Sequence, residues 1–316
     1  MNFKEIIQFA VENNFQELFL TVGSKPSLRI HKEIIEIENL PILNLVMLEN
    51  LLTEIISQNQ LNSIKEKEHV NFHYNISDLC NLNIFISYTN HHCFIKIKNL
   101  NPSKLTLEEL NLPSQIIKAI QDNSGLYIFS GENFDGKTST LNALIQKINQ
   151  EEKKLICILQ DEEQIKIQNQ KSIILNTEIE EIEDISPDVL VIDNLSNEKQ
   201  LHEIDKLLEN GKKILLSINA NSSVQTIQNI AAINEELAKK ILSQHLKLIC
   251  NMELLKSKAD SNLYPVSEVF IANSENFKIL ENLDYSQIQN LIETGKNQGM
   301  HTKKQDINAL QNLGLA

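Results

Sequence analysis

The spacing of apolar residues changes along the chain and divides it into two regions. Near the N-terminus, Phe3, Ile6, Ile7, Ala10 and Val11 recur at helical spacing, which predicts an amphipathic helix. Partly alternating apolar stretches follow at 17–22, 70–76, 83–88 and 94–98, and a second helical stretch covers 43–57. Partial alternation is typical of antiparallel strands with one buried face, so this region predicts a small α+β domain.

From about residue 115 the predicted strands are continuous apolar runs. These runs lie at 126–130, 155–159, 188–192 and 213–218, and they alternate with helical stretches. Such a pattern is typical of a parallel sheet covered on both faces. The predicted organisation is a first domain at 1–98, a polar, proline-containing linker at 99–114, and an α/β domain at 115–316.

Composition narrows the classes of function. The chain has 316 residues, of which 41% are hydrophobic and 22% charged, enough for two domains with separate cores. Its formal net charge of −13 argues against nucleic acid as the main partner, because phosphate backbones are bound by clustered lysine and arginine. No apolar run is long enough to cross a bilayer and the N-terminus does not resemble a signal peptide, so we expect a cytoplasmic protein.

The spacing of the cysteines and the scarcity of arginine argue against two further kinds of site. The four cysteines, Cys80, Cys93, Cys157 and Cys250, lack the C-x-x-C spacing of zinc sites, which favours reduced and mostly buried thiols. Arg29 is the single arginine among 29 basic residues. Chemistry that requires a planar guanidinium is therefore almost absent from this chain.

The segment after the first strand of the second domain fits the phosphate-binding pattern G-x-x-x-x-G-K-[ST]. In such a loop, backbone N–H groups and the helix N-terminus hold phosphate, the lysine reaches the terminal phosphates, and the threonine hydroxyl binds magnesium. The strand before it and the helix predicted over 138–149 supply the context that a P-loop needs. We therefore predict that ATP and Mg²⁺ bind through Gly131, Gly136, Lys137, Thr138 and Ser139.

The order of short motifs along nearly the whole chain resembles the type IV pilus retraction ATPases of the PilT type, members of the secretion ATPase superfamily. The matching stretches are F19-L-T-V-G-S-K-P-S-L-R-I30, L105-T-L-E-E-L110, G125-L-Y-I-F-S-G131, P187-D-V-L-V-I192, I214-L-L-S-I-N219 and G299-M-H-T302. The resemblance implies a role in twitching motility, an N-terminal PAS-like domain and a C-terminal RecA-like ATPase domain. It also implies a hexamer that holds ATP between the two domains.

The P-loop departs from the family pattern G-P-T-G-S-G-K-[ST] at Phe134 and Asp135. Phenylalanine replaces a glycine, which tolerates backbone geometry that larger residues do not, and the aspartate brings negative charge to a phosphate site. Both changes predict weakened nucleotide affinity. The alternative is that both side chains point outward into solvent, since these positions are formally free in the motif.

The end of the Walker B strand is altered as well. Asp193 and Asn194 fall where the family carries Gly-Glu, with the glutamate activating water. The resemblance implies that Asp193 binds Mg²⁺ through water and that Asn194 occupies the catalytic position, where an amide cannot accept a proton as a general base. A one-residue slip would instead make Asp193 a substitute catalytic acid.

Other family residues are missing. In the acidic box L159-Q-D-E-E-Q164, Asp161 remains as a weaker catalytic candidate, whereas glutamines replace two carboxylates. The family's arginine after Walker B, its box histidine and the arginines of its N-terminal sheet fall on Ser196, Asn219, Asn81, Asn83, His91 and Lys98. An arginine supplied across a subunit boundary is worth on the order of 10³–10⁵ in rate in other P-loop NTPases. The chain also lacks about ten residues before Pro187.

These losses leave two functions open. The first is a degenerate, hydrolysis-impaired relative that binds nucleotide weakly and acts as a regulatory or assembly subunit of the pilus machinery. The alternative is a slow but active type IV pilus retraction ATPase that works through Lys137, Thr138, Asp161 and Asp193. An unrelated P-loop kinase would leave the first domain unexplained.

The resemblance also predicts partners and location. The expected partners are the inner-membrane pilus machinery or a paralogous pilus ATPase, and no nucleic acid. We expect the protein in the cytoplasm, at most peripheral to the inner membrane at the base of the pilus. A stable self-hexamer is not expected, because the arginines that would bridge subunits are gone.

Overall fold

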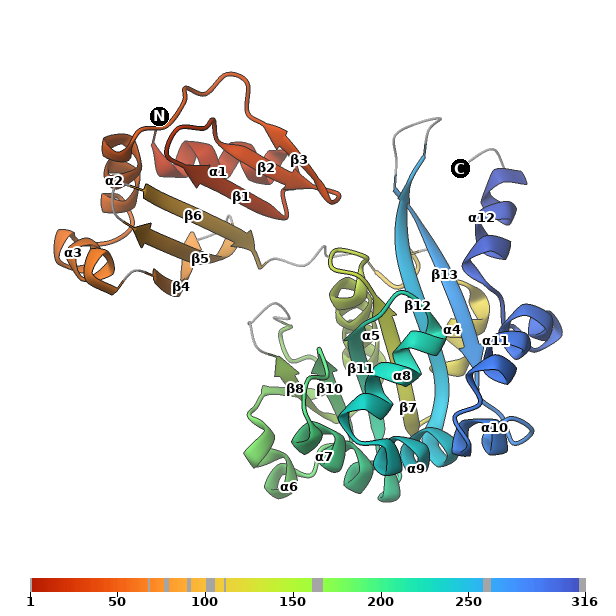
Figure 1. Ribbon diagram of the computed structural model, residues 1–316. Helices are drawn as coiled ribbons and strands as arrows, with labels where there is room; N and C mark the ends of the chain where they lie inside the picture. Colours follow the sequence, from red (N-terminus) through yellow and green to blue (C-terminus); the bar gives the residue numbers. More distant parts are fainter. Residues whose placement is uncertain are drawn as a thin grey trace. The chain divides into compact units, whose positions relative to one another are not determined.

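The chain forms two units, Met1–Pro102 and Ser103–Ala316. The computed structural model describes residues 2–67, 69–76, 80–89, 92–100, 106–110, 112–160, 167–257 and 263–312. Each unit has its own sheet and its own buried hydrophobic residues (Figure 1).

An antiparallel sheet of six strands is the centre of the first unit, in the order β3-β2-β1-β6-β5-β4. The strands are β1 (Glu17–Thr21), β2 (Ser27–Ile30), β3 (Glu33–Glu36), β4 (His69–Ile76), β5 (Cys80–Thr89) and β6 (His92–Asn99). Cys93, Ile95 and Ile97 alternate along β6 and are buried in the core of this unit. The partial alternation of the sequence therefore corresponds to a sheet with one buried face, as predicted.

Three helices complete the first unit: α1 (Phe3–Glu12), α2 (Leu45–Thr53) and α3 (Gln58–Lys67). Helix α1 begins with a capping box in which the Asn2 side chain accepts from the Glu5 N–H and the Glu5 side chain accepts from the Asn2 N–H. The single helix predicted over 43–57 is wrong in its extent, because α2 ends at Thr53 and a separate helix follows it. The β2–β3 hairpin was not predicted from the sequence.

A seven-stranded sheet in the order β13-β12-β7-β11-β10-β8-β9 forms the second unit. The strands are β7 (Gly125–Gly131), β8 (Leu155–Gln160), β9 (Ile173–Asn176), β10 (Val189–Asp193), β11 (Lys213–Asn219), β12 (Leu246–Lys256) and β13 (Leu263–Ile271). Six of these strands are parallel, but β13 runs antiparallel to β12. The sheet is therefore mixed, which corrects the prediction of a parallel sheet and leaves the α/β class confirmed.

Helices cover both faces of this sheet. They are α4 (Ser114–Ala119), α5 (Lys137–Glu151), α6 (Ile182–Ile185), α7 (Glu198–Glu209), α8 (Ser223–Ile233), α9 (Glu235–His245), α10 (Phe277–Glu281), α11 (Tyr285–Thr294) and α12 (Lys303–Asn312), with 3₁₀ turns at Ile179–Glu181 and Gly295–Gln298. Leu126 and Ile128 of β7 pack in the core beneath α7, α8 and α9, whereas Tyr127 and Phe129 pack in a second core with α4 and α5. Alternate residues thus face opposite helical layers, which explains why β7 is apolar throughout.

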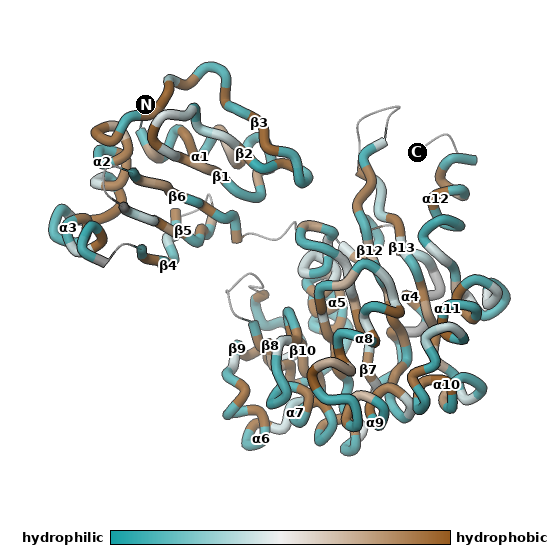
Figure 2. The backbone as a smooth tube through the Cα atoms, in the orientation of Figure 1, coloured by the Kyte–Doolittle hydropathy of each residue, from teal (hydrophilic) through white to brown (hydrophobic). Residues whose placement is uncertain are grey.

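Hydropathy along the chain agrees with this layering. Figure 2 shows that the central strands of the second unit are largely hydrophobic, while the helices over them change between hydrophobic and hydrophilic along their length.

The four cysteines are buried and free, as predicted. Burial raises the pKa of the Cys250 thiol to about 12, so this residue stays protonated.

Candidate functional site

The glycine-rich loop connects the end of β7 to the start of α5. Its first residue, Gly131, lies against the neighbouring strand, because a Cβ atom at this position would be 2.6 Å from the Met252 carbonyl oxygen. Gly136 precedes α5 with a φ of 90°, in the left-handed region that favours glycine. Ser139 follows in the first turn of the helix. The two glycines of the motif thus meet separate requirements, one of space and one of backbone conformation.

Phe134 occupies a strained position in this loop. Its φ is 71°, which is uncommon for a bulky side chain and costs on the order of 1–3 kcal/mol. The loop therefore keeps the left-handed backbone that a glycine would adopt without strain, although the residue is a half-buried phenylalanine.

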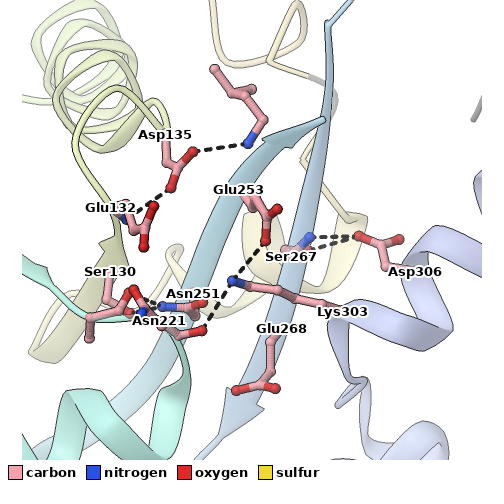
Figure 3. A network of polar contacts seen from close by, with 12 residues as sticks. Ser130, Glu132, Asp135, Asn221, Asn251, Glu253, Ser267, Glu268, Lys303 and Asp306 are labelled. Carbon is pink, nitrogen blue, oxygen red and sulfur yellow. Dashed lines mark hydrogen bonds and ion pairs between the residues drawn. The ribbon is translucent and has the colours of Figure 1, made fainter. Parts of the chain in front are cut away.

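The Asp135 side chain points into the protein, so the alternative that it extends into solvent is wrong. It is 2% exposed, and its carboxylate accepts hydrogen bonds from the Glu132 N–H at 2.9 Å and the Leu254 N–H at 3.2 Å. Figure 3 shows this carboxylate between the loop and β12. Asp135 thereby places a buried negative charge inside the loop and ties the loop to β12.

Lys137 lies across the same loop. Its ammonium group donates to the Glu132 carbonyl at 2.7 Å and to the Gly131 carbonyl at 3.0 Å. These carbonyls hold the positive charge beside the N-terminus of α5, where backbone N–H groups and the helix dipole favour an anion.

Thr138 and Asp193 meet where the loop faces the end of β10. The Thr138 hydroxyl donates to Oδ2 of Asp193 at 3.0 Å. The other carboxylate oxygen, Oδ1, accepts from the Ser217 hydroxyl at 2.7 Å. Hydroxyl and carboxylate oxygens are the ligands that Mg²⁺ prefers, so the donor set at Thr138 and Asp193 fits a magnesium ion bound together with phosphate oxygens.

Asn194 forms the turn that follows β10. Its φ is 83°, a left-handed conformation that asparagine adopts more readily than most residues, and its N–H donates to Ser217 Oγ at 2.9 Å. Within the described part of the chain, no hydrogen bond to its side-chain amide is observed. The Asp193 carboxylate, next to it in sequence, accepts from two hydroxyls, and the role of Asp193 as a substitute catalytic acid stays a prediction.

A second group of polar side chains lies behind the loop and was missed in the sequence. The Ser130 hydroxyl accepts from Thr226 Oγ1 at 2.7 Å and from Asn251 Nδ2 at 2.9 Å, and Asn251 also donates to the Ala220 carbonyl. All three side chains are fully buried. Figure 3 shows Ser130 beside Asn251. Buried polar groups are usually hydrogen-bonded, and a polar residue inside an apolar strand is the sequence signal that could have revealed Ser130 on β7 and Asn251 on β12. Thr226 lies on α8, where this signal does not apply.

The C-terminal helix is attached to the strand that carries Leu254. Lys303, the first residue of α12, donates to Glu253 at 3.2 Å and to the Asn221 carbonyl at 3.1 Å. One turn later, Asp306 accepts from the Ser267 N–H at 2.8 Å (Figure 3). The same strand, β12, therefore connects α12 to the P-loop.

Two of the other positions singled out in the sequence lie beside these residues. Asn219, exposed at the end of β11, pairs in register with Gly131, and Gln160, which donates to Asn176, pairs in register with Asp193. Ser196 donates its N–H to Gln200. Asn81, Asn83 and Lys98 lie on β5 and β6 of the first unit. Asp161, Gln164 and His91 lie outside the described residues. Among the described residues, no group of three or more His, Cys, Asp and Glu could hold a metal ion.

Comparison with known sequences defines the class of this protein. The family of type II/IV secretion system proteins matches residues 94–303, and the chain belongs to that family. The matched range includes the P-loop, β10 and Lys303. Within the described residues, no helix has the length and apolar character that a membrane span needs.

Individual relatives narrow the class. A twitching motility protein of Neisseria gonorrhoeae is 22% identical over 92% of this chain and 81% of that protein. In Pseudomonas aeruginosa, the type IV pilus ATPase PilU is 22% identical over 99% of this chain and 86% of its own length, and the type IV pilus retractation ATPase PilT is 20% identical over 100% and 95%. The resemblance to type IV pilus retraction ATPases indicated by the order of motifs is thereby confirmed.

Solved structures share the fold. The pilus retraction motor PilT with bound ADP matches 100% of this chain and 94% of its own, with a TM-score of 0.81 at 20% identity. The ATPase DotB of Legionella pneumophila matches 99% and 92%, with a TM-score of 0.82 at 14% identity. At these identities the likeness establishes the α/β fold with its mixed sheet.

Proposed function

We propose that this protein is a pilus-associated nucleotide-binding protein that binds ATP and Mg²⁺ weakly and hydrolyses ATP poorly. In this proposal, residues 1–98 form a PAS-like domain, 99–114 a linker, and 115–316 a RecA-like domain. Gly131, Gly136, Lys137, Thr138 and Ser139 hold the phosphates. The relatives named above are pilus ATPases, and this supports a place for the chain in the same machinery.

A single observation carries the proposal. Thr138 donates to Asp193 at 3.0 Å, while the next residue, Asn194, carries an amide instead of a carboxylate. The first contact keeps the residues that would hold Mg²⁺ beside a nucleotide. The amide removes the group that would take a proton from attacking water. Binding without efficient hydrolysis follows from this combination.

The strained and charged loop supports weak binding. Phe134 holds a left-handed backbone, and Asp135 keeps a buried negative charge close to the N–H groups that a phosphate would use. Like charges within a few ångströms in a poorly solvated site repel each other by several kcal/mol when unscreened. The affinity for ATP is therefore expected to be lower than in a glycine-rich loop without a carboxylate.

The proposed role is regulatory or structural within the pilus machinery. The partners would be the inner-membrane pilus machinery or a paralogous pilus ATPase, and the location would be cytoplasmic, peripheral to the membrane at the base of the pilus. Nucleic acid is not proposed as a partner.

The second candidate function is a slow but active retraction ATPase. The contacts of Lys137 with the loop and of Thr138 with Asp193 favour it, because they are those of a loop ready for a nucleotide. In this reading Asp161 would supply the missing carboxylate.

Two measurements on the purified protein distinguish the candidates. A fluorescent ATP analogue is titrated into the wild type and into Lys137→Ala, and steady-state hydrolysis is measured on the same samples. We expect binding that the substitution abolishes and turnover well below about 1 s⁻¹, the low end for enzymes. Lys304→Ala, which removes an exposed lysine of α12, is the charge-matched control.

The two candidate functions predict different results in these measurements. Turnover on the order of 1 s⁻¹ or more would establish the active ATPase instead. Equal affinity in the wild type and Lys137→Ala would show that nucleotide does not bind at this loop, and both candidate functions would then be wrong.

A further inference from the structure

Ser217 is a polar residue in the middle of an apolar strand. It lies on β11, which separates β7 from β10 in the sheet, and it pairs in register with Phe129. Its side chain is completely buried. A buried hydroxyl is costly unless it is hydrogen-bonded, so its partners indicate what it does.

Three consecutive residues are held by Ser217. Its hydroxyl donates to Asp193 Oδ1 at 2.7 Å and accepts from the Asn194 N–H at 2.9 Å, and its carbonyl accepts from the Leu195 N–H at 2.9 Å. The hydroxyl thus donates to the end of β10 and accepts from the left-handed turn that follows this strand.

These contacts fix the orientation of the Asp193 carboxylate. Oδ1 accepts from the Ser217 hydroxyl at 2.7 Å, and the Thr138 hydroxyl lies 3.0 Å from Oδ2 and 3.4 Å from Oδ1. Hydrogen bonds to a carboxylate are about twice as strong as those between neutral groups. Rotation of the carboxylate about its own axis would weaken both bonds, so Ser217 acts on Thr138 through Asp193.

We propose that Ser217 is a positioning residue for magnesium-dependent nucleotide binding. It holds the Asp193 carboxylate where that group receives the Thr138 hydroxyl, and it thereby determines how much Mg²⁺ strengthens the binding of a nucleotide. This inference rests on the proposed function, because it requires that the loop bind a nucleotide. Partners that orient metal-binding groups typically change metal affinity by 10- to 100-fold when removed, as an order of magnitude.

A purely structural role makes a different prediction. If Ser217 only satisfied the turn at Asn194, its loss would loosen the loop and weaken nucleotide binding equally with and without magnesium. A positioning role weakens binding only when Mg²⁺ is present.

The test compares the affinity for a fluorescent ATP analogue in Mg²⁺ and in EDTA. We expect Ser217→Ala to bind about tenfold more weakly in Mg²⁺ and to match the wild type in EDTA. Ser217→Thr, which keeps the hydroxyl, should restore the magnesium effect. If Ser217→Ala does not fold, Ser217→Cys takes its place, because a thiol nearly fills the same space but donates only weakly. Ser217→Cys should then bind the nucleotide more weakly in Mg²⁺ and like the wild type in EDTA.

Ser267→Ala is the matched control. Ser267 is a buried serine of the same sheet, on β13, and it contacts Asp306 and His301 rather than the loop. Its loss should leave both affinities unchanged. Equal weakening of Ser217→Ala in Mg²⁺ and EDTA, or no weakening, would overturn the role of Ser217 while the nucleotide site stands. A wild type without nucleotide binding would overturn the proposed function and this inference together.

Discussion

The Thr138 hydroxyl lies 3.0 Å from the Asp193 carboxylate, although 55 residues separate them along the chain. The two residues follow β7 and end β10, and β11 lies between these strands in the sheet. The contact therefore crosses the end of a third strand, the one that carries Ser217. A parallel sheet brings the carboxyl ends of its strands to one edge, and this is where ligands of open α/β sheets bind.

Restoring the acid alone should not restore activity. Asn194→Glu supplies a potential general base, but Ser196 and Asn219 still stand where the resembled family has an arginine and a histidine. We expect at most a small rise in ATP turnover, measured by phosphate release at saturating Mg²⁺ and ATP. Asn194→Gln, of the same length but without charge, is the control. A turnover on the order of 1 s⁻¹ in Asn194→Glu would show that the base was the single missing group.

Removing the charge inside the loop should strengthen nucleotide binding. Asp135→Asn keeps the shape of the side chain and eliminates a buried charge near the phosphate position, so the affinity for ATP should rise severalfold. The same change should lower the free energy of unfolding by about 1–3 kcal/mol, because an amide cannot accept from both the Glu132 and Leu254 N–H groups. Isothermal titration and urea unfolding measure the two effects.

Glu132→Gln removes one charge from the same loop at an exposed position and serves as the control. Its effect on affinity should be small, since solvent screens an exposed charge. Weaker ATP binding in Asp135→Asn would mean that the hydrogen bonds of Asp135 matter more for the loop than its charge.

Strain at Phe134 should be measurable by comparing two small residues. Phe134→Ala keeps a Cβ atom in the left-handed conformation, whereas Phe134→Gly removes it. We expect the glycine variant to unfold at a higher free energy than the alanine variant, by about 1 kcal/mol. Urea denaturation of both variants gives this difference directly. An alanine variant as stable as the glycine variant would indicate that the loop relaxes once the ring is removed.

Stability should fall in mildly acidic solution because of His245. Burial lowers the pKa of this histidine below its usual value, against the opposing attraction of Asp205 and Glu209. The unfolded chain, with a histidine pKa near about 6.5, therefore takes up the proton first, and the free energy of unfolding decreases as the pH falls below that value towards the folded pKa.

His245→Gln should reduce this decrease between about pH 7.5 and 5.5. The measurement is urea unfolding at several pH values, with His202→Gln, an exposed histidine of α7, as the matched control. An unchanged pH dependence in His245→Gln would assign the acid sensitivity to other groups.

Assembly should be weak in the isolated protein. A net charge of −13 opposes self-association at low salt, and charge pairs at a subunit edge mainly affect specificity and the rate of association. We expect light scattering after size exclusion to show a monomer or weak oligomer whose mass does not increase with ATP and Mg²⁺. Association with a less degenerate paralogue should be stronger. A stable ring of six subunits formed by the chain alone would favour the active retraction motor.

The sequence predicted best what depends on neighbouring residues. The apolar run at 126–130 and the predicted helix over 138–149 correspond to β7 and α5 within a few residues, because a run of apolar residues and a glycine before a helix are properties of the local sequence. The short strand β3 is exposed at all four residues, and its two adjacent isoleucines, Ile34 and Ile35, do not alternate with polar residues as in a strand with one buried face. The antiparallel course of β13 depends on pairing with β12, which no local pattern specifies.

The candidate site divides in the same way. The residues of the P-loop could be named from their spacing, whereas the inward turn of Asp135 depends on the Leu254 N–H, 119 residues away. The role of Ser217 likewise depends on how β10 and β11 are aligned. Contacts between residues so far apart along the chain are fixed by the packing of the sheet, and they cannot be predicted from the pattern of a single sequence.

The left-handed backbone at Asn194 limits what a single substitution can achieve at this position. Asparagine adopts a φ of 83° at little cost, but a glutamate there would carry the extra energy of that conformation as well as its own charge. In the proposed function, one substitution to the acid would therefore add a base and weaken the turn at the same time. A variant that gains the base without losing stability would need a second change that relaxes the turn.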